Sequence, residues 1–350
     1  VLGILTMLRL PLPQENLKPS SWRRIILELL GSLVLLVCIN LALIVYLGNL
    51  TTNFGYWTIH QKWWLLEHLE QPVDWLILGD SSCNQGVMPE IFTNELGETA
   101  LNLCTIGNLG TVDDLWMLEE YIDRFGPPLH VLIVHVFDIW HRPLDPVIIG
   151  QVPRPWGFWE QHTLGAYLFE EEVIRQETFL ERYLPLYSQT RTVTNILRTT
   201  ITLQHNPFMP AWRLEPDGFL VATESHVEVV IAGAADQIKF AAENVFSISP
   251  TNDMAMQEIG VLADSYGFEV YLVNSPVYQG LYDDPAYQAY LAGVQQKLAE
   301  FDSDNAYVFH IPAVRAFPAE SMQNPDHLIL TGAVEYTHWL IEQVAALHRH

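Results

Sequence analysis

The longest apolar stretch of the chain runs from Ile25 to Gly48, and its only charged residue is Glu28. Within it, Leu29 to Leu47 is a 19-residue run without charge. At about 1.5 Å per residue, a helix of this length spans roughly 30 Å, which is the thickness of the hydrocarbon core of a bilayer. Such a helix has no polar face for water, so residues 25–48 are predicted to form a transmembrane helix.

The charges that flank this run predict its orientation. Four basic residues precede it against Glu15 alone, and the next basic residue after it is Lys62. The four are Arg9, Lys18, Arg23 and Arg24. The positive-inside rule therefore places residues 1–24 in the cytoplasm as a basic tail and residues 49–350 outside it, on a single-pass protein of the cell membrane. A cleaved signal peptide is the alternative, but the apolar run exceeds the usual length of about 7 to 15 residues and no A-x-A site follows.

Beyond the membrane segment, short apolar runs alternate with segments of helical periodicity. This alternation is typical of βαβ units and predicts an α/β fold with a central parallel sheet between helical layers. The predicted strands are Val73–Leu78, Thr99–Cys104, Val131–Phe137, Glu269–Val273 and Ala306–His310, and the predicted helices include Val112–Phe125, Pro285–Phe301 and Thr331–Leu347.

Three further regions complete the predicted organisation. Residues 49–71 hold a Trp-rich juxtamembrane helix, Tyr56 to Leu69. Residues 72–350 form the main domain, which is interrupted at about 140–225 by a stretch rich in Pro and Trp. We interpret that stretch as an insertion on the side of the sheet where α/β proteins place their substrate-facing loops. Its Trp140, Trp156 and Trp159 would suit stacking on sugar rings, although core packing is the commoner role of such residues.

Composition narrows the possible functions. Apolar residues make up 49% of the 350-residue chain and charged residues 17%, which excludes extended disorder. The net charge of −24 repels phosphate backbones, so no nucleic-acid partner is expected. The three cysteines, Cys38, Cys83 and Cys104, form no C-x-x-C pair that would indicate a zinc ribbon. His130 and His135 flank one predicted strand, where histidines are usually structural, so no metal is expected.

Candidate chemistry begins where the first predicted strand ends. The strand Trp75–Leu78 runs into Gly79, Asp80, Ser81 and Ser82. A serine at a strand-to-helix turn exposes its hydroxyl at the carboxyl edge of the sheet, and glycine permits the sharp turn. These residues can equally serve only to cap the following helix, which is a frequent arrangement.

Two later segments supply the other groups that a nucleophilic serine requires. Asn102–Asn108 follows the second strand and contains Gly107, whose N–H could approach a reacting oxygen closely. Asn324–Ala333 precedes the last helix and contains Asp326 and His327. A serine needs a base to remove its proton, and the base needs an orienting partner.

Together the three segments resemble the SGNH/GDSL hydrolase superfamily. Gly79-Asp80-Ser81 matches its first block, Asn102 to Gly107 resembles its second, and Asp326-His327-Leu328 with Gly332-Ala333 looks like its last. The membrane-tethered layout resembles the branch with the alginate O-acetyltransferases and the lipoteichoic acid D-alanylation protein. The resemblance covers roughly 72–138 and 268–345.

The resemblance implies an SGNH-like three-layer sandwich and assigns roles to individual residues. Ser81 would be the nucleophile, His327 the base, and Gly107 a donor of the oxyanion hole, with no cofactor. The implied reaction is ester hydrolysis or acyl transfer through an acyl-Ser81 intermediate. Its substrates would be acyl esters, above all acetyl groups on a cell-envelope or secreted polysaccharide, and a membrane acyltransferase is the implied partner. The competing interpretation is a catalytically weakened module that binds glycan or a membrane partner.

Two positions depart from the pattern of the superfamily. Its acid usually stands three residues before the histidine, where this chain has Asn324, while Asp326 immediately precedes His327. Chemistry favours Asp326 as the orienting group because a carboxylate stabilises an imidazolium, whereas position favours Asn324. Only one of the two is expected to face the imidazole. An asparagine usually follows the third strand, where this chain has Asp138.

Cys83 and Cys104 would lie near each other if Ser81 and Gly107 share a site. An exterior location permits a disulfide there, and two buried thiols are the alternative.

Overall fold

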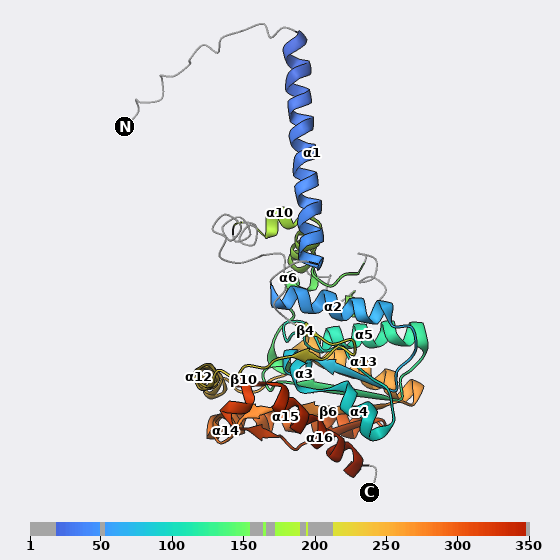
Figure 1. Cartoon of the computed structure of the whole chain (residues 1–350), viewed down its shortest axis with the longest axis vertical. Helices are drawn as coiled ribbons and strands as arrows, with labels where there is room; N and C mark the ends of the chain where they lie inside the picture. The colour runs from blue at the N-terminus through green and yellow to red at the C-terminus, as the bar shows by residue number, and fades with distance from the viewer. Residues whose placement is uncertain are drawn as a thin grey trace, which may run out of the picture.

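The computed structural model describes residues 19–49, 53–154, 164–165, 172–189, 194 and 213–347. A long helix, α1 (Pro19–Asn49), stands on an α/β body that holds the rest of the described chain (Figure 1). The first 18 residues, with Arg9 and Lys18, lie outside the described residues, as do Trp156 and Trp159.

The body is built on a five-stranded parallel sheet, as the apolar runs predict. Its strand order is β2-β1-β3-β6-β8. The strands are β1 (Trp75–Gly79), β2 (Ala100–Asn102), β3 (His130–His135), β6 (Glu269–Asn274) and β8 (Val308–Ile311). All five predicted strands are therefore confirmed, and the α/β class with them.

Helices cover both faces of the sheet. Successive strand residues point to opposite faces, and both faces carry apolar side chains that must be buried. Leu76 and Leu78 pack against one helical layer, whereas Trp75 and Ile77 pack against the other. The first layer holds α5 (Gly110–Phe125), α13 (Pro250–Tyr266) and α15 (Pro285–Asp304), and the second holds α4 (Pro89–Leu96) and α16 (Leu330–Leu347). The predicted helices α5, α15 and α16 are confirmed. The helices α13 and α12 (Val227–Glu243) were not predicted from the sequence.

Helix α2 (Phe54–His68), which the sequence predicts beside the membrane, is part of the same core. Its Trp63 and Leu66 are fully buried against the first helical layer. Its Lys62 is also fully buried, and Nζ donates hydrogen bonds to Asn102 O (2.8 Å), Asn102 Oδ1 (2.9 Å) and Gly218 O (2.5 Å). Burial lowers the pKa of Lys62 well below its usual value. Lys62 thus ties α2 to the end of β2.

Helix α1 is long and apolar enough to cross a membrane from Trp22 to Leu47, and it is the only such helix among the described residues. Its side chains are exposed over most of this length. Only its last turns pack on the body, where Leu43 and Leu47 contact Tyr56 of α2.

The remaining elements are short and surround the carboxyl edge of the sheet or join the larger helices. They are α3 (Ser81–Gly86), η1 (Ile139–His141), α6 (Pro146–Ile149), α9 (Glu172–Tyr183), α10 (Pro185–Ser188), β4 (Arg213–Leu214), β5 (Leu220–Val221), β7 (Val277–Tyr278), α14 (Gln279–Tyr282), β9 (Ala316–Phe317), η2 (Ala319–Ser321), β10 (Met322–Asn324) and β11 (His327–Leu328).

Candidate active site

The candidate site lies at the carboxyl ends of β1 and β3, where the strand order reverses. In open α/β sheets this switch point is the usual place for a ligand. A cavity of about 700 Å³ opens there. Its lining includes all five residues singled out from the sequence, namely Ser81, Gly107, Asn324, Asp326 and His327. The fold thus brings together residues that lie up to 246 positions apart.

The turn that carries Ser81 depends on Gly79. This glycine has φ 139°, and a Cβ at its position would lie 2.0 Å from the carbonyl oxygen of Val134. Asp80 follows as the N-cap of α3, and its side chain accepts a hydrogen bond from the N–H of Ser82 (2.7 Å). The Ser82 hydroxyl also donates to Asp80 (2.5 Å). Asp80 therefore caps α3 and is bound by the Ser82 hydroxyl, while Ser81 lines the cavity.

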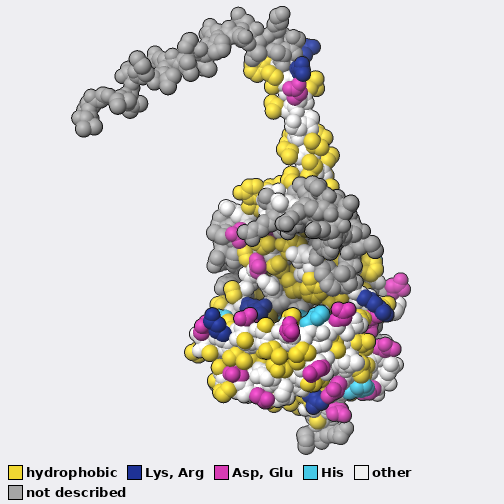
Figure 2. Space-filling view, turned by 60° about the vertical axis from the view of Figure 1, so that its left-hand side comes forward, with side chains coloured by type: hydrophobic (Ala, Val, Ile, Leu, Met, Phe, Trp, Pro, Cys, Tyr) yellow, Lys and Arg dark blue, Asp and Glu magenta, His cyan; other side chains and the backbone are white. Residues whose placement is uncertain are grey.

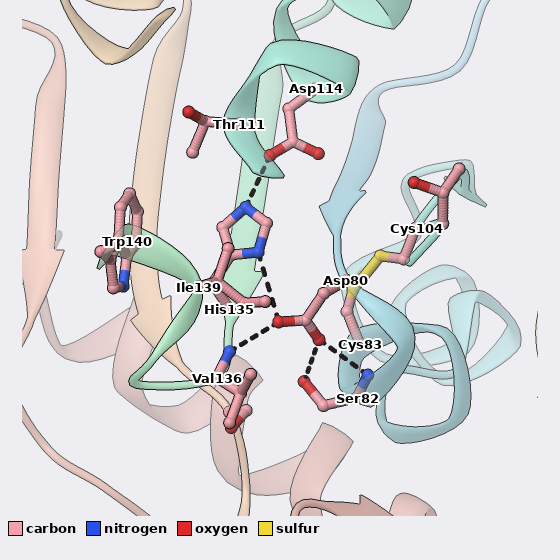
Figure 3. A network of polar contacts seen from close by, with 12 residues as sticks. Asp80, Ser82, Cys83, Cys104, Thr111, Asp114, His135, Val136, Ile139 and Trp140 are labelled. Atoms are coloured by element: carbon pink, nitrogen blue, oxygen red, sulfur yellow. Dashed lines mark hydrogen bonds and ion pairs between the residues drawn. A yellow bond between two sulfur atoms is a disulfide. The ribbon is translucent and has the colours of Figure 1, made fainter. Parts of the chain in front are cut away.

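A buried ionic chain holds this turn against β3 (Figure 3). His135 lies between two carboxylates, with Nδ1 3.3 Å from Asp80 Oδ2 and Nε2 2.6 Å from Asp114 Oδ2. Asp80 Oδ2 also accepts the N–H of Val136 (2.7 Å). All three ionisable side chains are almost completely buried. The network joins the N-cap of α3, the second turn of α5 and the end of β3, so it fixes the backbone that presents Ser81.

Electrostatics in this chain favour a protonated histidine. Burial alone would lower the pKa of His135, but the charges and hydrogen bonds of Asp114 and Asp80 outweigh it and raise that pKa to about 9. Burial likewise opposes ionisation of Asp80, but His135, Ser82 and Val136 lower its pKa to about 2. Near neutral pH the network therefore holds a protonated His135 beside an ionised Asp80.

We predict that His135→Leu destabilises the protein by about 3–5 kcal/mol, because it leaves two buried carboxylates without their cation. The matched control is His130→Leu on the same strand, where the side chain is partly exposed and flanked by Glu98 and Glu269. It should cost about 1 kcal/mol or less. Urea unfolding of the full-length chain in detergent, followed by tryptophan fluorescence, measures both. Equal losses for the two variants would contradict the structural role of His135.

The sign of the pH dependence follows from the same shifts. The folded-state pKa of His135 lies above its ordinary 6.5, so its stabilisation is complete below pH 6.5 and is lost as pH rises through about 9. The folded-state pKa of Asp80 lies below its ordinary 3.8, so its stabilisation is present above that pH and is lost as pH falls through about 2.

The hairpin β10–β11 positions the other half of the site. Asn324 and His327 are directly opposite in its antiparallel register, and Pro325 and Asp326 form the two-residue connection. Paired residues of antiparallel strands project from the same face, so the two side chains meet. No sequence pattern predicts this hairpin, because the segment reads as a loop before the last helix.

Both candidate orienting groups contact the same imidazole nitrogen. Asn324 Oδ1 lies 2.8 Å from His327 Nδ1, and Asp326 Oδ1 is in closer contact with it. The expectation that only one of them could face the ring is therefore wrong, since the hairpin presents one from its strand and the other from its turn. Asn324 Oδ1 also accepts the backbone N–H groups of Asp326 (3.1 Å) and His327 (2.9 Å).

This arrangement sets the protonation of His327. Asp326 is itself held by Gln237 of α12, whose Nε2 lies 2.7 Å from Asp326 Oδ2. Burial lowers the pKa of His327, but the charge and hydrogen bond of Asp326 outweigh this effect and the net pKa is raised. Because Nδ1 is occupied, Nε2 is the ring nitrogen that can receive a proton.

The Gly107 loop closes the cavity on the opposite side. A Cβ at Gly107 would lie 2.1 Å from Ile139 Cδ1 and 3.2 Å from Arg142 Nη1, so the loop packs directly on the segment after β3. A disulfide joins Cys83 of α3 to Cys104 of this loop, with Cα atoms 5.8 Å apart. Of the two alternatives for these cysteines, a disulfide or two buried thiols, the structure has the disulfide. It links the Ser81 turn to the Gly107 loop.

Arg142 is a site residue that the sequence analysis missed. It lines the cavity, and its Nη2 lies 2.5 Å from Asp138 Oδ2. Burial lowers the pKa of this guanidinium, but the Asp138 charge outweighs burial and raises it further. Asp138, which departs from the superfamily pattern, therefore holds a cation beside Gly107. The spacing of four residues between the two was the available signal.

Other candidates fall outside the cavity. Trp140 is fully buried and packs edge-on against His135, so its role is core packing and stacking on a sugar is excluded for it (Figure 3). Within the described part of the chain, no cluster of three or more His, Cys, Asp or Glu side chains could hold a metal ion.

Searches with this chain against protein-family models and against curated proteins return no match.

Proposed function

We propose that the chain is a membrane-anchored SGNH-like serine esterase or O-acyltransferase whose body lies outside the cytoplasm. The observation that carries this proposal is the contact of Asp326 and Asn324 with His327 Nδ1 in a cavity also lined by Ser81 and Gly107. A histidine with a carboxylate on one nitrogen and a serine in the same cavity is the constellation needed for acyl transfer. A module that only bound glycan would not require it.

Each residue has a defined part in the proposed reaction. Ser81 Oγ attacks the carbonyl carbon of the ester while its proton passes to His327 Nε2. Asp326 stabilises the imidazolium formed, and Asn324 holds the ring orientation. His327 then returns the proton to the departing alkoxide, and the ester bond breaks to leave acyl-Ser81. Water or a sugar hydroxyl releases the acyl group by the same steps in reverse.

The oxyanion of the tetrahedral intermediate needs donors, and we assign two. The N–H of Gly107 is the first, because its loop borders the cavity beside the Ser81 turn. Arg142 is the second, since its guanidinium adjoins Gly107 and carries a full positive charge. A cation there would take the place of the asparagine that the superfamily uses, and it would act in a partly enclosed cavity where charge stabilisation is strong.

The anchor and the basic residues before it restrict where the substrate of the proposed enzyme can lie. Helix α1 and the basic residues before it support insertion with the body outside the cytoplasm. We infer O-acyl groups, above all acetyl, on a cell-envelope or secreted polysaccharide, with a membrane acyltransferase as the partner that supplies or accepts the acyl group.

Covalent labelling tests the proposal directly. The full-length protein is incubated with a fluorophosphonate, from which a nucleophilic serine displaces fluoride, and the modified peptide is identified by mass spectrometry. We expect stoichiometric modification of Ser81 in the native protein and none after denaturation. Native protein that stays unmodified while it still binds an acetylated polysaccharide would overturn the enzyme in favour of the binding module.

A further inference from the structure

The corner between α9 and α10, residues Phe179–Tyr187, packs along the last turns of α1 and reaches inward to Asn40. Asn40 of α1 donates from Nδ2 to the carbonyl oxygen of Tyr183 (2.8 Å), and its Oδ1 accepts the N–H of Leu186 (3.1 Å). These are backbone groups that the break between α9 and α10 leaves without helical partners. One side chain of α1 therefore satisfies both.

The position of Asn40 along the helix fixes the depth of this corner. The apolar helix runs from Trp22 to Leu47, and a hydrocarbon core of about 30 Å takes up about 20 residues of it. Every window of that length within Trp22–Leu47 contains Asn40. Its distance from the outer end of the span, at about 1.5 Å per residue, is about 10 Å. If α1 spans a bilayer, the backbone bonded to Asn40 lies within or at the edge of the hydrocarbon.

The surface of the corner has the chemistry of a lipid-facing surface. Leu184 and Tyr187 are exposed to 44% and 73%, and Phe179 to 45%. A groove of about 690 Å³ separates the corner from α1, and the described residues that line it are apolar apart from Asn40 and Tyr187. No acidic residue is among the described residues that line it. Figure 2 shows hydrophobic side chains along α1 above the body.

We propose that the α9–α10 corner is embedded in the bilayer leaflet nearest the body, and that phospholipid acyl chains fill the groove between it and α1. The inference rests on the anchoring proposed above. Two features favour lipid over a second copy or another protein. The groove is continuous with the exposed face of the span, and Asn40 pairs with the C=O of Tyr183 and the N–H of Leu186 in the corner. In hydrocarbon an unsatisfied backbone group is costly, so this pairing is what an embedded turn requires. The corner is thus a second, non-spanning membrane contact that prevents the body from rotating about α1.

Depth-dependent quenching tests this in proteoliposomes of phosphatidylcholine that carries a nitroxide either near the headgroup or near the chain end. One sample carries a fluorophore on Cys38, the exposed cysteine of α1. A second carries it on Tyr187→Cys, and a third on Val245→Cys at a 90% exposed site of the body, both in a Cys38→Ser background. We expect the Tyr187 label to lose most of its fluorescence to the headgroup-proximal nitroxide and the Val245 label to lose almost none.

The Cys38 label separates the two levels of the proposal. Quenching at Cys38 with no more quenching at Tyr187 than at Val245 overturns the embedded corner and leaves the anchor standing. No quenching at Cys38 overturns the anchor and the embedded corner together. Cross-linking between Tyr187→Cys side chains of two copies, without quenching by lipid, assigns the groove to a second copy instead.

Asn40→Leu supplies an independent variant, since it makes the span more apolar while it removes both hydrogen bonds to the corner. In this variant we expect the Tyr187 label to be quenched no more than the Val245 label. In a chain that retains Cys38, we expect quenching of the Cys38 label to persist. Ile39→Leu, on an exposed neighbour, is the matched control and should change neither. Undiminished quenching at Tyr187 in Asn40→Leu would show that Asn40 does not hold the corner at this depth.

Discussion

Ser81→Ala is expected to lower turnover of a chromogenic acetyl ester by up to about 10⁶-fold, the largest effect of any single substitution in this chain. Without the Ser81 hydroxyl no acyl-enzyme can form, so only the oxyanion donors and substrate binding remain. Steady-state kinetics of the full-length protein in detergent measures kcat/KM for the native chain and the variant. The substitution removes one oxygen from a side chain that lines the cavity, so the free energy of unfolding should stay nearly unchanged.

The neighbouring serine offers the matched control. Ser82 is fully buried, and its hydroxyl donates to Asp80 instead of facing the cavity. Ser82→Ala should therefore reduce stability by about 1 kcal/mol through the lost hydrogen bond and leave most of the activity. If Ser81→Ala retains native turnover, or if Ser82→Ala abolishes it while Ser81→Ala does not, then Ser81 is not the nucleophile.

Asp326→Asn should lower kcat/KM by about 10⁴-fold, because an amide cannot stabilise the imidazolium and can hold the ring in the wrong tautomer. The variant keeps the size of the side chain and a hydrogen-bonding oxygen for Gln237. A loss of rate without a loss of stability would therefore report the missing charge. Single-turnover measurement of acylation separates this step from release of the acyl group.

Asn324→Ala is the comparison that ranks the two partners of His327. Its Oδ1 holds the ring and two backbone N–H groups of the hairpin, but it carries no charge. We therefore expect a smaller loss of acylation rate than for Asp326→Asn, accompanied by some loss of stability. The reverse ranking would transfer the principal role to Asn324. No change in either variant would mean that His327 is not the base.

The strands of the central sheet were predictable from the sequence. Parallel strands are buried on both faces, so they appear in the sequence as continuous apolar runs. β1, β3 and β6 have this property, and their ends match the predictions within two residues. The Ser81 turn and the Gly107 loop were predictable for a related reason, since parallel strands place their carboxyl ends at one edge. What joins them in space is the strand order, which the sequence pattern does not contain.

The interactions that tune the site were not predictable, because they come from segments with no local signal. Asp114 and His135 lie 21 residues apart, yet their side chains form a hydrogen bond between α5 of the first helical layer and β3 of the sheet. Gln237 donates a hydrogen bond to Asp326 from α12, a helix that was not predicted from the sequence. The hairpin β10–β11 is only a few residues long, so no period of two could develop in its sequence. Such contacts depend on tertiary packing alone.

The Cys83–Cys104 bridge has a consequence for when the site becomes competent. Cytoplasmic thiols are kept reduced, so the bridge would form only after the body has left the compartment where it is made. Until then, packing alone would hold the helix that bears Ser81, the proposed nucleophile, against the loop that bears Gly107, a proposed oxyanion donor. A newly synthesised chain would therefore be a poor catalyst, and the acyl esters of the cytoplasm would be spared until export and oxidation complete its maturation.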